Sequence, residues 1–253
     1  MTIVAESSDS SEDSKEQQII RIATVIDDEF QPYLSQLRES FDRVRQLVSA
    51  ANRLRVLGCS PSAADDVLRS AVVLTHACLE DFLRTLISRI LPQGDECALK
   101  DIPLAGTGRG KPQFHLGQLA QHRQKTVDSV IRESIAEFLD RTTFNNTTEI
   151  AQVLELLRIE PHSEGVKGSF SGLDQMIRRR HQIVHRSDKL KGTSTLEPIH
   201  ISQVQDWLKA TDDFTIGVMS SIVANSVVKL LKAEREGSQS LTPTAPTDTR
   251  SHG

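Results

Sequence analysis

The sequence predicts an all-α protein, folded as a helical bundle with a long N-terminal helix. Apolar side chains recur every three or four residues through several long segments, which is the spacing of one face of an α-helix. Loops rich in proline and glycine, such as residues 92–113, separate these segments. No set of segments alternates apolar and polar residues as paired strands do.

The first predicted helix covers residues 17–57 and contains Pro32, which predicts a bend. The sequence Gly-Cys-Ser-Pro at residues 58–61 ends this helix. Ser62 is then the expected N-cap of a second helix over residues 63–91.

Four further helices are predicted in the rest of the chain. Their ranges are 116–141, 148–159, 171–186 and 202–234. The polar ends, residues 1–16 and 235–253, are too poor in apolar side chains to fold and are predicted to be disordered. The expected organisation is therefore a single domain over residues 17–234.

Composition excludes several classes of function. The net charge of −4 gives no support for binding nucleic acid through bulk charge, so such a site would need a local basic patch. The three cysteines form no CxxC pair, which predicts neither a zinc site nor a disulfide framework and favours a reducing, cytoplasmic location. No apolar run is long enough to predict a membrane span.

Residues 173–188, LDQMIRRRHQIVHRSD, carry most of the candidate chemistry. At about 100° per residue, the apolar side chains of this segment gather on one side of a helix; they are Leu173, Met176, Ile177, Ile183 and Val184. Arg180 falls within this arc, where a permanently charged guanidinium needs an anion or a functional reason. Arg178 and Arg179 are predicted to be ordinary basic surface.

Alternatives to a catalytic site remain for this segment. Arg180 could form an internal ion pair, with Glu80 as the candidate partner. His181 and His185, four residues apart, could hold a metal ion, but Gln182 stands where a metalloprotease needs glutamate and no third ligand can be placed. We therefore expect no metal and no other cofactor. The glycine-rich stretch at 106–111 does not fit a phosphate-binding loop and is predicted to be surface.

A functional interpretation combines Arg180 with His185. A histidine titrates near neutral pH and can move a proton during phosphodiester cleavage. A fixed guanidinium stabilises the negative charge that develops on the phosphate. RNA supplies its own nucleophile, the 2′-hydroxyl. A two-fold dimer that buries this helix would bring two such sets together.

The same residues resemble a known family. Arg180-His181-x-x-x-His185 looks like the R-x4-6-H motif of the HEPN superfamily, and its surroundings resemble bacterial stand-alone members of the RiboL-PSP/MAE-like group. The stretch AVVLTHACLEDFLRTLISRI, which contains Glu80, resembles an early helix of that group. TFNNTTEIAQVLELLRI resembles its helical insert. The resemblance spans roughly residues 65–232.

The resemblance implies an α-helical bundle that dimerises around the motif helix, and a metal-independent endoribonuclease of the kind found in toxin and antiphage defence systems. Arg180 would stabilise the scissile phosphate, His185 would act as acid or base, and His181 would orient the site or contact RNA. Glu80 would support the site. The RNA-binding residues would be Arg178, Arg179 and Arg186. An antitoxin or another defence-system partner is expected. The alternative is a HEPN module that binds RNA or protein without catalysis.

Overall fold

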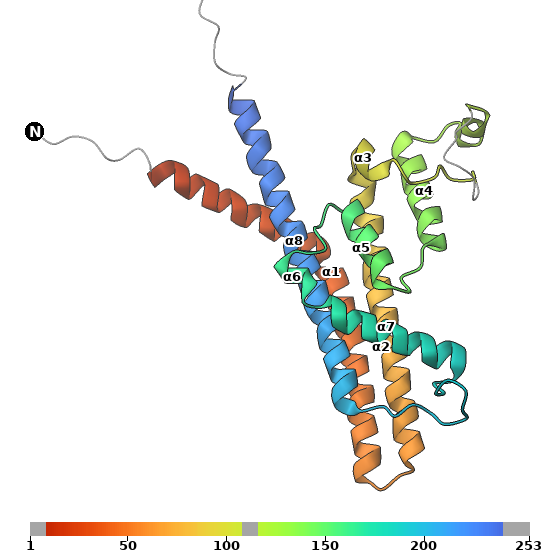
Figure 1. Ribbon diagram of the computed structural model, residues 1–253. Coiled ribbons are helices and arrows are strands. Elements are labelled where there is room, and N and C mark those ends of the chain that lie inside the picture. The colour runs from red at the N-terminus through yellow and green to blue at the C-terminus, as the bar shows by residue number, and fades with distance from the viewer. Residues whose placement is uncertain (1–8, 108–115, 240–253) are drawn as a thin grey trace, which may run out of the picture. The chain divides into compact units, whose positions relative to one another are not determined.

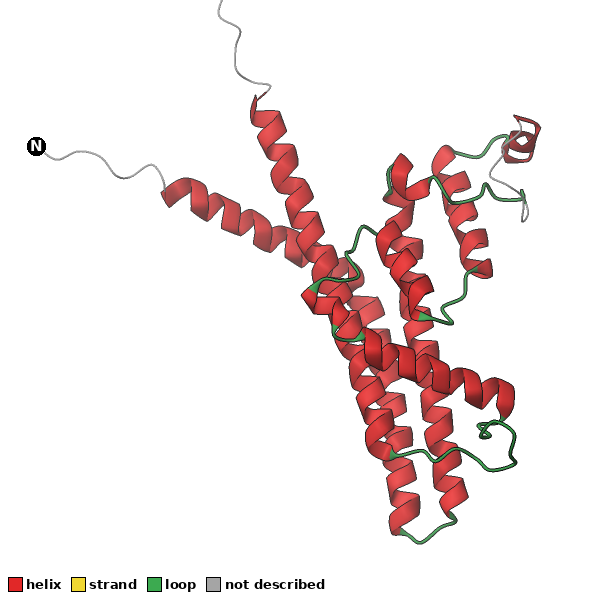
Figure 2. Cartoon of the chain, in the orientation of Figure 1, coloured by secondary structure: helices red, strands yellow, loops and turns green. Residues whose placement is uncertain are grey.

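A computed structural model of the chain describes residues 9–107 and 116–239 and is helical almost throughout (Figure 1, Figure 2). The predicted all-α fold class is confirmed, because these residues form only helices, turns and one isolated β-bridge between Lys189 and Leu196. Residues 1–8, the chain beyond Gln239 and most of the glycine-rich stretch at 106–111 lie outside the described residues.

The helices follow one another along the chain, and the longest connections are residues 100–115 and 187–200. The α-helices are α1 (Asp9–Val56), α2 (Pro61–Ile90), α3 (Glu96–Leu99), α4 (Val127–Arg141), α5 (Thr147–Leu156), α6 (Glu164–Lys167), α7 (Phe170–Arg186) and α8 (Ile201–Gln239). Two 3-10 helices, η1 (Leu91–Gln93) and η2 (Leu116–His122), precede α3 and α4.

The predicted single helix over residues 116–141 is wrong. The chain there forms η2 and then α4, and Gln124 between them has a left-handed φ of 71°. Thr126 caps the new helix, since its hydroxyl accepts a hydrogen bond of 3.2 Å from the backbone N–H of Ser129. The boundary falls in residues 121–126, QHRQKT, which carry no apolar side chain.

The first two helices differ from their predicted limits at their starts. α1 begins at Asp9, before Gln17, and continues through Pro32 as one helix. α2 begins at Pro61, so that Ser60 and not Ser62 occupies the position before the helix. Proline suits the first position of a helix because it has no N–H to leave unpaired.

The chain divides into two compact units. The larger unit comprises residues 31–219, and the other combines the chain up to Phe30 with the chain from Ser220 onwards. All the predicted site residues belong to the larger unit. Its core is formed by α2, whose buried face includes Leu68, Leu79 and Leu83.

Helix α7 crosses α2 within the larger unit (Figure 1). Its first half buries Leu173, Met176 and Ile177, which confirms this part of the predicted apolar stripe. Gly172 allows a close approach to α8, because a Cβ at this position would lie 2.5 Å from the Cβ of Ala210. The C-terminal part of the predicted apolar stripe is not fully buried, since Ile183 is half-buried and Val184 is exposed.

A buried ion cluster joins α2, α7 and the loop that follows α7. The Asp188 carboxylate has no exposed surface and accepts hydrogen bonds from Arg69 Nε at 2.6 Å and from Arg179 Nη2 at 2.9 Å. Arg179 Nε also lies 2.8 Å from the second oxygen of this carboxylate. Two guanidiniums from different helices thus share one buried anion.

The same two arginines hold the far end of the loop. Arg69 Nη2 and Arg179 Nη2 donate to the carbonyl oxygen of Glu197 at 3.0 Å and 2.9 Å, and Arg179 also donates to the carbonyl of Pro198 at 3.0 Å. A backbone hydrogen bond from Glu197 to the Asp188 carbonyl closes the loop at 2.8 Å. Residues 187–200 are therefore folded back against α2 and α7.

The prediction that Arg179 is ordinary basic surface is wrong, since only 6% of this residue is exposed. The side of α7 that carries Arg179 is covered by residues 187–200, the returning loop. The periodicity of one helical segment does not show which of its faces another segment covers. Asp188 supplies the anion that a buried guanidinium requires. This pairing also removes Arg179 from the residues predicted to contact RNA.

Replacing Asp188 by Asn should lower the free energy of unfolding by about 3–5 kcal/mol, because two buried guanidiniums lose their shared anion. The measurement is urea-induced unfolding at neutral pH.

The matched control is Asp174→Asn, which breaks an ion pair of 2.8 Å with Arg178 on the exposed side of the same helix. That pair should contribute less than about 1 kcal/mol. Equal losses for the two variants would show that the buried cluster is no more important than a surface pair.

Candidate functional site

The last turns of α7 present three of the predicted site residues together. His181 and His185 are both exposed, and their ring centroids lie 4.4 Å apart with the rings tilted by 44°. Arg180 precedes them and is half-buried. The two imidazoles can therefore meet solvent or a ligand while the guanidinium reaches inwards.

Arg180 has no anionic partner among the described residues. Its closest polar contact is a weak hydrogen bond from Nη1 to the amide oxygen of Asn145 at 3.5 Å, and no described carboxylate comes within 4.0 Å of it. Its Nε is buried and makes no hydrogen bond. A partly buried cation in this state is suited to binding an anion.

The alternative of an ion pair between Arg180 and Glu80 is wrong. Glu80 instead pairs with Arg84 at 2.8 Å, one turn further along α2, and its second oxygen lies 3.9 Å from His76 Nδ1. His76, Glu80 and Arg84 form a polar row along α2, four residues apart. This spacing places all three on one face of the helix.

The polar row on α2 holds the turn between α4 and α5. His76 Nε2 lies 3.0 Å from the carbonyl oxygen of Phe144, to which it can donate. Arg84 donates to the carbonyl of Thr142 at 2.8 Å and to that of Leu139, and its guanidinium lies 5.3 Å from the ring centroid of Phe144. Residues 142–146 are thereby fixed beside α7.

The spacing of the motif fits Arg178, Arg179 and Arg180, because each lies five to seven residues before His185. The structure separates their roles. Arg178 is exposed and pairs with Asp174, and Arg179 is buried on Asp188. Arg180 is the one of the three without a carboxylate partner among the described residues.

A family model described as RiboL-PSP-HEPN matches residues 35–216, which is more than half of the chain. The chain belongs to this HEPN family. No protein of curated function and no solved structure matches the chain. The match begins within α1, includes the whole of α7, and ends within α8.

The structure places Arg180, His181 and His185 on one late helix, α7, as the sequence predicts. Arg186 is also exposed at the end of α7, next to His185. Within the described residues, no three histidine, cysteine or acidic side chains gather closely enough to hold a metal ion. Nor does any helix in the described part of the chain have the length and apolarity to cross a membrane.

Sequence reasoning missed Asn145 as a neighbour of Arg180. The available signal was the Asn-Thr-Thr-Glu stretch at residues 146–149, which has the pattern of an N-terminal capping box. Asn146 does cap α5, with its side-chain oxygen 2.9 Å from the N–H of Glu149. A rigid helix start therefore follows directly after Asn145.

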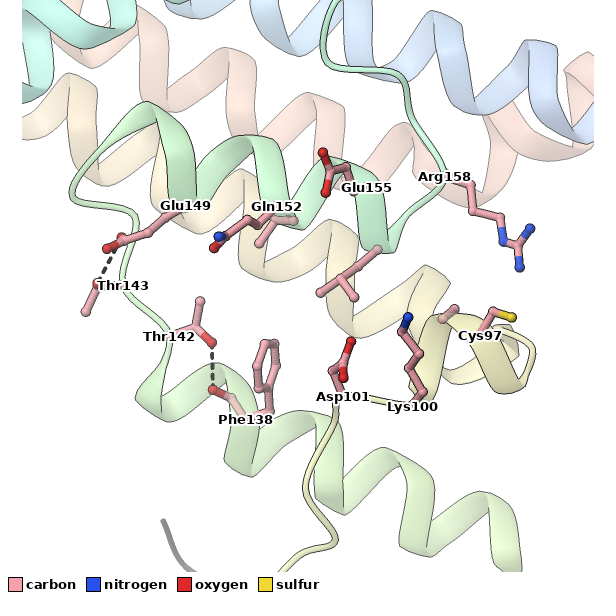
Figure 3. A pocket seen from close by; sticks show the side chains of 13 residues that line it. Cys97, Lys100, Asp101, Phe138, Thr142, Thr143, Glu149, Gln152, Glu155 and Arg158 are labelled. Atoms are coloured by element: carbon pink, nitrogen blue, oxygen red, sulfur yellow. Dashed lines mark hydrogen bonds between the residues drawn. The ribbon is translucent and has the colours of Figure 1, made fainter. Parts of the chain in front are cut away.

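The turn between α4 and α5 also lines a pocket of about 840 Å³ (Figure 3). Thr142 and Thr143 contribute to one side, Lys100 and Asp101 contribute from the segment after α3, and Arg158 contributes from the turn after α5. Its lining combines both signs of charge, and no residue of the histidine motif takes part. We therefore assign the candidate site of this HEPN domain to α7 and not to this pocket.

Burial lowers the pKa of His76 below its ordinary value of 6.5, and the positive charge of Arg180 acts in the same direction. The hydrogen bond to Phe144 and the charge of Glu80 raise the pKa but do not outweigh burial. His76 is therefore neutral at physiological pH and acts as a hydrogen-bond donor to the turn.

This lowered pKa predicts a loss of stability in mild acid. As the pH falls through 6.5, the unfolded chain binds a proton at residue 76 before the folded chain does, so the free energy of unfolding decreases. His76→Gln should flatten this dependence between about pH 7 and pH 5, measured by urea unfolding at several pH values. The exposed His200→Gln is the control, and an unchanged slope in His76→Gln would contradict the assignment.

Proposed function

We propose that this HEPN protein is a metal-independent endoribonuclease that acts as a homodimer. The observation that carries the proposal is the unpaired, half-buried guanidinium of Arg180 beside the two exposed imidazoles of His181 and His185. A phosphodiester supplies the anion that Arg180 lacks. The imidazoles supply groups that can accept and donate a proton during the reaction.

The proposed reaction uses the 2′-hydroxyl of RNA as nucleophile. A bond forms between this oxygen and the adjacent phosphorus while the bond from phosphorus to the 5′-oxygen breaks. One imidazole accepts the proton of the 2′-hydroxyl, and a second group donates a proton to the departing 5′-oxygen. The products are a 2′,3′-cyclic phosphate and a 5′-hydroxyl, and no water or metal enters this step.

Each residue has a distinct role in this proposal. Arg180 stabilises the extra negative charge on the phosphorane. His185 transfers the proton, and His181, stacked against it, orients its ring or contacts RNA. Arg178 and Arg186 are exposed on α7 and contact neighbouring phosphates. Glu80 supports the site indirectly, through His76 and Arg84.

The dimer is proposed because apolar side chains remain exposed near the end of α7 and on the loop that follows it. Val184 is 50% exposed on α7, and Leu190 and Leu196 on the returning loop are about 40% exposed. A second copy of the same surface would cover these side chains and bring two His185 imidazoles into one site. Such a composite site would contain both a proton acceptor and a proton donor.

A biological role as a toxin or antiphage defence effector fits such an enzyme. A ribonuclease that needs no cofactor would damage its own cell unless it is restrained. We therefore propose that it acts on RNA in the cytoplasm under the control of an antitoxin or another defence-system partner.

A second candidate is a HEPN module that binds RNA or protein without cleaving. The exposed cations Arg178 and Arg186 favour this alternative, because they can bind phosphates whether or not His185 transfers a proton. In that case RNA binding would weaken with salt, and no cyclic phosphate would form.

The ribonuclease is tested with RNA in the presence of EDTA. His185→Ala should slow cleavage by about 10²–10⁴-fold, because proton transfer is lost. Arg180→Ala should slow it by about 10²–10³-fold. The control is His200→Ala, an exposed histidine outside the motif, which should cleave at the wild-type rate. Cleavage by His185→Ala at the wild-type rate, or its absence in the wild type, would refute the proposal.

The dimer is tested by sedimentation velocity. Val184→Glu places a charge in the proposed interface and should convert the dimer to monomer, with loss of cleavage. Leu57→Glu is the matched control, because Leu57 is 77% exposed at the turn between α1 and α2, away from α7. A Val184→Glu protein that remains a fully active dimer would exclude this surface.

A further inference from the structure

We infer that Asn145 is a positioning residue that orients Arg180 toward the scissile phosphate without neutralising its charge. The inference rests on the proposed function, because it assigns a role within the same site. It follows from three observations: the turn that carries Asn145 is fixed from two sides, its side-chain amide contacts Arg180, and that contact is uncharged.

Helix α5 fixes the turn from one side. The Glu149 carboxylate accepts hydrogen bonds from Thr143 Oγ1 at 3.0 Å, from the backbone N–H of Asn145 at 2.9 Å and from Asn146 Nδ2 at 2.8 Å. Figure 3 shows the first of these contacts, with Glu149 reaching from α5 to Thr143. One carboxylate thus binds three residues of the turn, Thr143, Asn145 and Asn146.

Helix α2 fixes the turn from the other side. The contacts of His76 and Arg84 hold the carbonyls of Phe144 and Thr142, and Phe144 itself is 1% exposed. The backbone on both sides of Asn145 is therefore anchored. Asn145 remains exposed, so its side chain stands on a rigid support.

Within the described residues, the side-chain amide of Asn145 makes one contact, the 3.5 Å hydrogen bond from Arg180 Nη1. An amide oxygen accepts this bond through a dipole and leaves the full positive charge of the guanidinium for a ligand. A carboxylate in the same place would form an ion pair and compete with phosphate. Contacts of catalytic groups are often long without substrate and shorten when it binds.

Asn145→Ala tests this role. The variant keeps the backbone N–H that bonds Glu149, so the melting temperature should stay within about 1 °C of wild type, while the single-turnover cleavage rate should fall by about tenfold. The shape of the pH profile should not change, because His185 is intact. Thr148→Ala, an exposed change in the first turn of α5, is the control and should leave the rate unchanged.

Asn145→Asp tests the need for an uncharged partner. The new carboxylate should pair with Arg180, raise the KM for RNA and slow cleavage more than Asn145→Ala does. A double variant gives the decisive comparison: in the Arg180→Lys background, Asn145→Ala should cause no further loss of rate. An equal tenfold loss in that background would show that Asn145 acts independently of Arg180 and would overturn the inference.

A measurement that needs no catalysis separates this inference from the ribonuclease proposal. The ¹⁵N relaxation of the Arg180 side chain in the full-length protein should report greater mobility in Asn145→Ala than in wild type. A wild-type protein that does not cleave RNA would refute the ribonuclease, yet the relaxation would still test the contact. Unchanged mobility in Asn145→Ala would refute the positioning role even if the wild type cleaves RNA.

Discussion

The buried carboxylate of Asp188 is the constraint on which the candidate site depends. It joins Arg69 on α2 to Arg179 on α7, and both arginines also bind the carbonyl of Glu197. These contacts fix the rotation of α7 against α2 and fold the following loop back on both helices. Because a helix is rigid over two turns, the same contacts determine where Arg180 and His185 point.

Arg179 and Arg180 have different surroundings because they lie about 100° apart around α7. Arg179 faces the returning loop, where its charge is balanced by Asp188 inside the protein. Arg180 faces the turn before α5, where it contacts the side-chain amide of Asn145 and no described carboxylate. The first arginine therefore stabilises the fold, and the second keeps a charge that a phosphate can use.

The site depends on segments far apart in the chain. The row of His76, Glu80 and Arg84 on α2 binds the turn at residues 142–146, and this turn meets Arg180 on α7. Glu80 is therefore connected to Arg180 through the turn and not by direct contact. In this arrangement Arg180 has no carboxylate partner among the described residues, whereas a direct ion pair with Glu80 would have neutralised its charge.

The sequence by itself determined the all-α class, the family resemblance and most helix positions, because helical spacing of apolar residues and the order of residues in a motif are local properties. It did not determine the break before α4, because the left-handed backbone at Gln124 and the cap at Thr126 are set by the folded chain. Only the tertiary structure decided that Arg179 is buried and that Asn145 meets Arg180. Both outcomes depend on segments that fold back over α7, and no periodicity within one helix contains that information.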